Sequence, residues 1–162
     1  MTLRSFPRLG DDKRGAAVIE LALSAPFLAA LIIGMSDMAC AYSVKLICEQ
    51  AAQRTIEQVQ QQKSVATSYN TALSTEAASA MTAAGYSTGN TITPDSWVEC
   101  SSNGTTWTKK TNFTDACSST EMTARYVKVT ISRGYTPLFT NWGWTTVNGV
   151  ITVSGYAEVR IQ

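Results

Sequence analysis

Glu20 is the residue whose type and position most require a chemical explanation. Its carboxylate stands at the start of a long apolar stretch. An unpaired charge there costs a few kcal/mol or more if the stretch lies in a membrane. Glu20 should therefore have a partner, and the alternative is a carboxylate that simply lies at a membrane interface.

The rest of the composition excludes several function classes. The chain has no His, which removes the commonest general base near neutral pH and the commonest ligand for zinc, copper or non-haem iron. No nucleophile stands beside a base in motif form, and no glycine pattern for phosphate appears. A net charge of +1 gives no case for nucleic acid. We expect no catalytic site, no cofactor, no metal and no small-molecule substrate.

The charge pattern indicates that Glu20 lies on a long apolar helix. No charged residue occurs between Glu20 and Asp37. A helix over residues 16–42 reaches about 40 Å at ~1.5 Å per residue, which is enough to cross a bilayer. The low charged share of 15% also favours a membrane role for part of the apolar content. We predict a transmembrane helix over residues 16–42.

Two alternatives are a buried core helix and a removable secretory signal. No other part of the chain is apolar enough to surround such a helix on all sides. The apolar region of a secretory signal is only about 7–15 residues long. Here the helical pattern continues to about Gln62, with inward-facing positions at three- and four-residue steps: Val44, Cys48, Ala52, Thr55, Ile56 and Val59.

Basic residues ahead of the apolar stretch indicate its orientation. Arg4, Arg8, Lys13 and Arg14 precede it, accompanied by only two acidic residues. Basic residues favour the cytoplasmic side. The N-terminus should therefore remain in the cytoplasm, with residues 43–162 outside the inner membrane.

The N-terminal third resembles a known family. A basic leader, Gly15, and an apolar helix with Glu20 at its fifth position resemble the processing site of type IV prepilins and pseudopilins. Arg14, Pro26, Gly34 and Asp37 narrow the resemblance to the TadE-like family of the Tad/Flp pilus system, over about residues 14–60. The quoted stretch reads RGAAVIELALSAPFLAALIIGMSDMACAY.

The resemblance implies a processing event. A prepilin peptidase would cut between Gly15 and Ala16, so that residues 1–15 form a cytoplasmic leader and Ala16 becomes the new N-terminus. Glu20, from the same chain or a neighbouring subunit, would neutralise the new ammonium group. The alternative is that Gly15 is only a flexible joint. Pro26 should kink the helix, and we expect Asp37 to lie near the outer interface, in water rather than beside a partner.

We predict that residues 43–162, the part outside the membrane, form a pilin-like α+β domain. After the helix over 43–62, a second helix is expected over 65–84, ending by Gly85 in a turn that runs to Asn90. Alternating residues predict a small antiparallel sheet of about three strands, which the helices would cover. The expected strands lie near 97–101, 126–132 and 151–161.

The four cysteines divide into two pairs. Cys100 and Cys117 flank a polar loop in the part expected to be periplasmic, and we predict a disulfide between them, with free thiols as the alternative. Cys40 and Cys48 lie about 12 Å apart along one helix and cannot bond each other. We expect them to be small packing residues, with a bridge between subunits as the alternative.

Aromatic residues gather in the connection from Gly134 to Gly149. Trp142 and Trp144 are the largest of them. One interpretation folds these rings over the sheet edge as part of the core, and the other makes them a contact surface for another pilus subunit.

Two functions remain. The first is a non-catalytic pseudopilin or minor pilin of the Tad system, in adhesion or secretion. The resemblance implies the prepilin peptidase, the system's ATPase, platform proteins and other pilins as partners, and a place in the inner membrane or a surface pilus. The second is a membrane-tethered binding module or adhesin, which would not need a new N-terminus at Ala16. An envelope enzyme is the weakest hypothesis.

Overall fold

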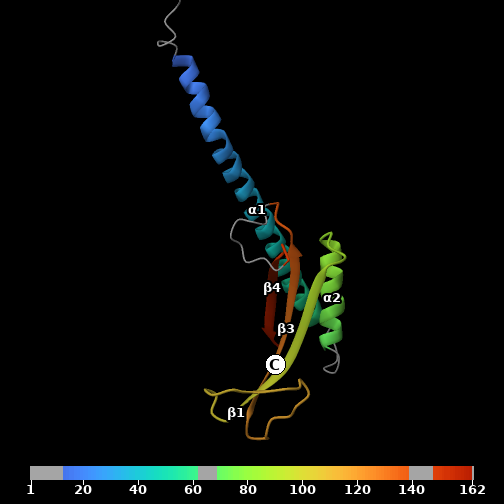
Figure 1. Ribbon diagram of the computed structural model, residues 1–162. Helices are drawn as coiled ribbons and strands as arrows, with labels where there is room; N and C mark the ends of the chain where they lie inside the picture. The colour runs from blue at the N-terminus through green and yellow to red at the C-terminus, as the bar shows by residue number, and fades with distance from the viewer. Residues whose placement is uncertain (1–12, 62–68, 139–147, 162) are drawn as a thin grey trace, which may run out of the picture.

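The computed structural model describes residues 13–61, 69–138 and 148–161. A long helix α1 (Lys13–Gln61) continues from the apolar stretch into a domain built of helix α2 (Tyr69–Ala83) and four strands. The strands are β1 (Asn90–Ser101), β2 (Thr108–Lys110), β3 (Met122–Tyr135) and β4 (Ile151–Arg160). Figure 1 shows the N-terminal half of α1 projecting away from this domain. The predicted α+β class is confirmed.

The four strands form one antiparallel sheet in the order β2-β1-β3-β4. About three strands were expected, and β2 was missed because its three residues are all exposed and show no apolar alternation. The expected strand near 97–101 was too short, since β1 already begins at Asn90. Pro94 within β1 hid this extension. Proline is tolerated there because β2 pairs only with residues 98–100, which leaves β1 an edge strand at Pro94.

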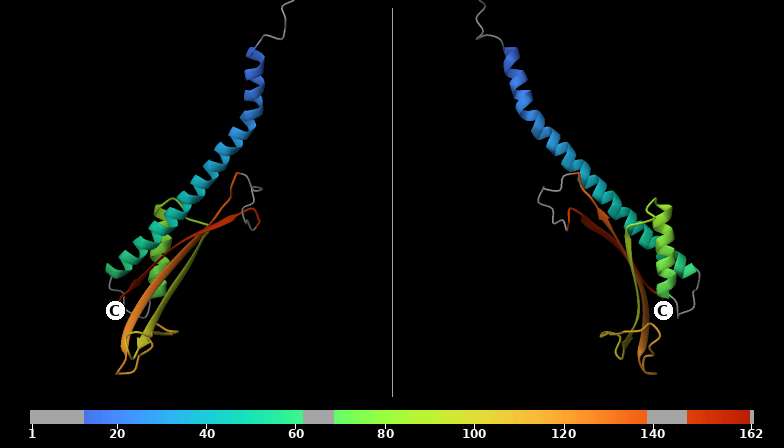
Figure 2. Two further views of the ribbon diagram at one scale, coloured as in Figure 1. Left: turned by 90° about the vertical axis from the view of Figure 1, so that its left-hand side faces the viewer. Right: turned by 45° about the vertical axis from the view of Figure 1, so that its right-hand side comes forward.

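Both helices cover the same face of the sheet (Figure 2). The C-terminal half of α1 packs on β3 and β4, and α2 packs on α1 and β1. The alternation predicted for β3 is confirmed, since Val127, Val129 and Ile131 are fully buried. The positions of α1 predicted to face inward are buried: Val44, Cys48, Ala52, Thr55, Ile56 and Val59. Helix α2 buries Leu73, Ala77, Ala80 and Met81 in the core.

The end of α2 follows the predicted stop signal. Gly85 adopts a positive φ of 89°, and the amide of Tyr86 donates a hydrogen bond to the carbonyl of Met81 at 2.9 Å. A glycine in this conformation ends a helix because its missing Cβ removes the steric penalty. The turn does not extend to Asn90 as expected, because Asn90 is already paired with Arg133 in the sheet.

β4 approaches α1 so closely that only glycine fits at the contact. A Cβ added to Gly155 would lie 2.6 Å from the backbone carbonyl carbon of Cys48 and would also clash with the backbone of Glu49. Since backbone atoms cannot move aside as a side chain can, Gly155 sets the depth at which the sheet meets the helix. Through this contact, the β3–β4 hairpin is held along α1.

Candidate functional site on the anchor helix

The bond between Gly15 and Ala16 lies in the first turn of α1. Gly15 is exposed, and a Cβ built on it meets nothing within 4 Å. Glycine destabilises a helix by about 1 kcal/mol relative to alanine, so this turn unwinds more easily than the alanine-rich turns after it. Among the described residues, no atom lies close to the side of Gly15 on which a side chain would project.

Glu20 is exposed and stands four residues after Ala16, which places it on the same helix face one turn further along. Within the described part of the chain, neither of the two salt bridges includes Glu20. The N-terminal end of a helix carries about half a positive charge from its aligned peptide dipoles. An ammonium group at Ala16 would add to that charge, and the Glu20 carboxylate is the group placed to offset both.

The N-terminal half of α1 exposes apolar side chains on all of its faces. Between Val18 and Met35, large apolar residues are exposed at positions that cannot share one face. A window of this helix has a mean hydropathy of 2.1, and none of that window is buried by the rest of the chain. A helix that is apolar all round and uncovered has the character of a membrane anchor. The most exposed of these residues are Val18, Ile19, Leu21, Leu23, Phe27, Ile32 and Met35.

Pro26 lies inside this uncovered half. Figure 2 shows that α1 bends within its blue N-terminal part. Proline removes one backbone hydrogen bond and displaces the preceding turn, which accounts for the bend. Gly34 is half buried and lies one turn before the buried Asp37.

Asp37 is buried, so the expectation that it faces water was wrong. It is only 7% exposed, and its Oδ1 accepts hydrogen bonds from the Tyr135 hydroxyl and from the backbone amide of Leu138, both at 2.9 Å. One carboxylate thus ties the end of β3 to α1. The prediction was wrong because the hydroxyl and amide come from residues about a hundred positions away, which no local pattern can place.

The two unpaired cysteines differ from each other. Cys48 is fully buried in the core between α1 and the sheet, as expected for a packing residue, and this burial raises the pKa of its thiol. Cys40 is exposed on α1, so the expectation that it is a packing residue was wrong. The helix turns Cys40 out of the buried stripe that Asp37 and Val44 share.

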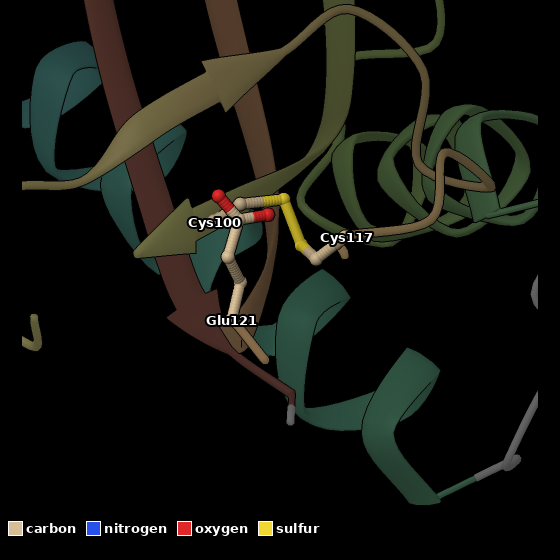
Figure 3. Close-up of side chains that lie close together, drawn as sticks. All are labelled: Cys100, Cys117 and Glu121. Atoms are coloured by element: carbon tan, nitrogen blue, oxygen red, sulfur yellow. A yellow bond between two sulfur atoms is a disulfide. The ribbon is translucent and has the colours of Figure 1, made fainter. Parts of the chain in front are cut away.

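The predicted disulfide between Cys100 and Cys117 is present, with a Cα–Cα distance of 5.6 Å. It ties the loop after β1 back to that strand. Figure 3 shows the Glu121 carboxylate beside the bridge, and the three side chains have ligand atoms within 4.8 Å of one another. The disulfide consumes both thiolates that a soft metal would need, and the Glu121 carboxylate already accepts a 2.9 Å hydrogen bond from the Ser118 amide. The disulfide and the Glu121–Ser118 hydrogen bond therefore stabilise the loop between β2 and β3, and the three side chains do not form a metal site.

A comparison with protein families gives a match over the part of α1 that contains Gly15, Glu20 and Asp37. The family model of TadE-like proteins matches residues 15–56. The resemblance predicted from the sequence is confirmed, and it supports a pilin-like protein associated with the Tad pilus. No curated protein and no solved structure shows a significant match to the chain.

The TadE-like segment contains one side of the Asp37 contact and the β3–β4 hairpin contributes the other. Tyr135 and Leu138 lie outside the segment, and the sequence alone predicted no contact between either of them and Asp37. The only available signal was the aromatic content of the connection that starts at Gly134. Trp142 and Trp144, the predicted partner-contact residues of that connection, lie outside the described residues.

Proposed function

We propose that this chain is a pseudopilin or minor pilin of a Tad/Flp pilus system, a non-catalytic subunit that serves pilus assembly in adhesion or secretion. One observation carries the proposal. The TadE-like segment joins an exposed Gly15, a Glu20 carboxylate one turn beyond Ala16, and an apolar helix that the described residues leave exposed. A tethered protein with no processing would need only the last of these.

The proposed topology is a single pass through the bacterial inner membrane. Residues 1–15 form the cytoplasmic leader, residues 16–42 the transmembrane part of α1, and residues 43–162 a periplasmic domain. The basic residues before the apolar stretch support the cytoplasmic N-terminus. The Cys100–Cys117 disulfide supports an oxidising compartment for the domain.

The proposed maturation step is cleavage between Gly15 and Ala16 by a prepilin peptidase. A charge within the membrane costs about 2.5–3.5 kcal/mol even on the insertion scales that give the lowest values. The Ala16 ammonium group and the Glu20 carboxylate each carry such a cost alone, and pairing lowers both. When Glu20 pairs with the ammonium group of a neighbouring subunit, the same interaction sets the axial register between two helices. The other partners are Tad pilins and the assembly platform.

Determination of the mature N-terminus tests this proposal. The full chain is expressed with and without an active prepilin peptidase, extracted from membranes and subjected to N-terminal sequencing. The expected N-terminus is Ala16 with the peptidase, while the chain retains its leader without it. A membrane-extracted chain that keeps residues 1–15 in the presence of active peptidase would contradict the proposal.

A matched pair of variants separates processing from assembly. Glu20→Gln keeps the shape of the side chain but removes the charge, so cleavage should continue while incorporation into the assembly complex falls. Glu20→Asp keeps the charge and should retain most of the assembly. If both variants assemble like the wild type, Glu20 has no neutralising role.

A membrane-tethered binding module or adhesin is the second candidate. The face of the sheet away from the helices carries Trp97 stacked on Tyr126 with ring centroids 5.4 Å apart, and the Lys109 ammonium lies 3.9 Å from the Trp97 ring. Tyr156 on the same face is 64% exposed. Trp97 itself is only 7% exposed, so Tyr156 and the basic side chains are the groups that would contact a ligand. Leader cleavage distinguishes the two candidates, since an adhesin of this kind needs no new N-terminus.

Trp142 and Trp144 remain a proposed contact surface for another pilus subunit. The double substitution to alanine should leave the membrane level of the chain unchanged and reduce its co-purification with other pilins. Wild-type folding together with wild-type complex assembly would count against this role.

A further inference from the structure

A pocket of about 240 Å³ opens between α1 and the β3–β4 hairpin, beside the Asp37 contact. Its walls are almost entirely apolar. Asp37 and Tyr135, which are hydrogen-bonded to each other, line its inner part. Lys45 also lines it, with its side chain 48% exposed. The apolar walls come from Met38, Ala41 and Tyr42 on one side and from Pro137, Ile151 and Val153 on the other.

The pocket lies where α1 leaves the apolar stretch. Asp37 is the first charged residue after Glu20, and Lys45 lies about 12 Å further along the helix at ~1.5 Å per residue. The polar region of a bilayer leaflet is about 5–8 Å thick, and the flexible side chain of Lys45 can bend back towards it. The pocket therefore spans the boundary between lipid tails and headgroups.

Large apolar side chains around the pocket remain uncovered by the described residues. Met38 is 56%, Tyr42 61% and Leu138 77% exposed. The hydrogen bond from the Leu138 amide to Asp37 fixes Leu138 at the level of the boundary. These side chains continue the exposed apolar surface of α1, so the medium that covers the helix should also cover the mouth of the pocket.

An occupant must suit both an apolar cavity and a cation at its edge. At this depth, a phospholipid combines an acyl chain with an anionic phosphate. The Lys45 ammonium lies 3.4 Å from the Glu49 carboxylate, but both side chains are more than a third exposed and such a pair is weak. An ammonium group has three donors, so Lys45 can contact a phosphate without leaving Glu49.

We propose that this pocket holds one acyl chain of a phospholipid from the periplasmic leaflet, with Lys45 facing the phosphate. The bound lipid would fill the gap between α1 and the hairpin and steady the domain against the membrane surface. The inference rests on the proposed anchor and its orientation.

Photocrosslinking of the full chain in phosphatidylglycerol vesicles tests this. The vesicles contain a phosphatidylglycerol with a diazirine on one acyl chain, and labelled peptides are mapped by mass spectrometry. We expect labels on residues 151–153 as well as along residues 18–35. Ala41→Trp, which fills the pocket, should lower labelling of 151–153 about tenfold, the equivalent of excluding about two methylene groups. Met35→Trp is the matched control outside the pocket and should not change it.

Further variants control for misfolding of Ala41→Trp and test the role of the Lys45 charge. Ala41→Leu is a smaller filling that should lower the labelling in the same direction. Lys45→Gln should reduce retention of phosphatidylglycerol by the purified protein in native mass spectrometry, and Lys45→Arg should preserve it.

The outcomes separate the two proposals. Labels along residues 18–35 with none on 151–153 overturn the lipid site and leave the anchor intact. Crosslinked dimers through the pocket would show that a second copy of the chain occupies it, which also overturns the lipid site. Absence of labels from residues 18–35 as well would contradict the membrane anchor itself.

Discussion

Removal of the Tyr135 hydroxyl tests whether Asp37 ties the β3–β4 hairpin to the anchor helix. Tyr135→Phe deletes one 2.9 Å hydrogen bond to a carboxylate that is 7% exposed. Hydrogen bonds to charged groups contribute about 1.5–3 kcal/mol. The free energy of unfolding should therefore fall by that amount, while the Leu138 amide keeps Asp37 partly satisfied.

Asp37→Ala removes the acceptor of two donors at once, the Tyr135 hydroxyl and the Leu138 amide. A buried donor without a partner costs about 1–3 kcal/mol. Because Leu138 is 77% exposed, its amide exchanges Asp37 for water, so the loss should be about 1–3 kcal/mol and come from the Tyr135 hydroxyl. Once Asp37 is absent, deletion of the Tyr135 hydroxyl costs little. The double variant should therefore be more stable than the sum of the two changes predicts, by about 1.5–3 kcal/mol.

The assay is urea unfolding of the full chain in detergent micelles, with the disulfide intact and near-UV circular dichroism as the signal for packing of the domain. Tyr156→Phe is the control, because Tyr156 is 64% exposed and its hydroxyl has no such role. It should change stability by less than about 0.5 kcal/mol. Additive single and double variants, or a Tyr135→Phe effect no larger than that of Tyr156→Phe, would refute the reasoning.

Three further predictions concern the same domain. Burial, and then the hydrogen bond to Asp37, raise the pKa of Tyr135 to about 12, above the unfolded value of about 10. The protonated Tyr135 hydroxyl therefore contributes fully to the free energy of unfolding below about pH 10, and this contribution is lost as the pH rises towards 12. Unfolding measured across that window should show a steeper loss for the wild type than for Tyr135→Phe, and equal slopes would contradict this. Gly155→Ala should lower the thermal midpoint through about 1–3 kcal/mol of overpacking against the α1 backbone, whereas Ser154→Ala on the exposed face should not. Replacement of Cys100 and Cys117 by serine should cost about 3 kcal/mol in urea unfolding, from the 17-residue separation that the bridge closes; an unchanged midpoint would show that the loop is already fixed by other contacts.

Repeating patterns made the helices and strands β3 and β4 predictable. In α1 the buried positions recur every three or four residues, from Val44 to Val59, and in β3 they alternate from Val127 to Ile131. Both periods are properties of the local backbone, so they can be read without knowing what lies opposite. The start of β1 broke its pattern at Pro94, and β2 has no buried residue to create one.

Consecutive residues alone predict the long apolar helix: an uncharged stretch between Glu20 and Asp37, a glycine before it and a helical period after it. These are features of consecutive residues, and so is the helix stop at Gly85. Three features could not be predicted without the packed fold: the burial of Asp37, the position of Gly155 against the α1 backbone, and the pocket beside Lys45. Each of these depends on segments about a hundred residues apart meeting at atomic distance, and the packing of the sheet on the helix, which no local pattern encodes, sets that meeting.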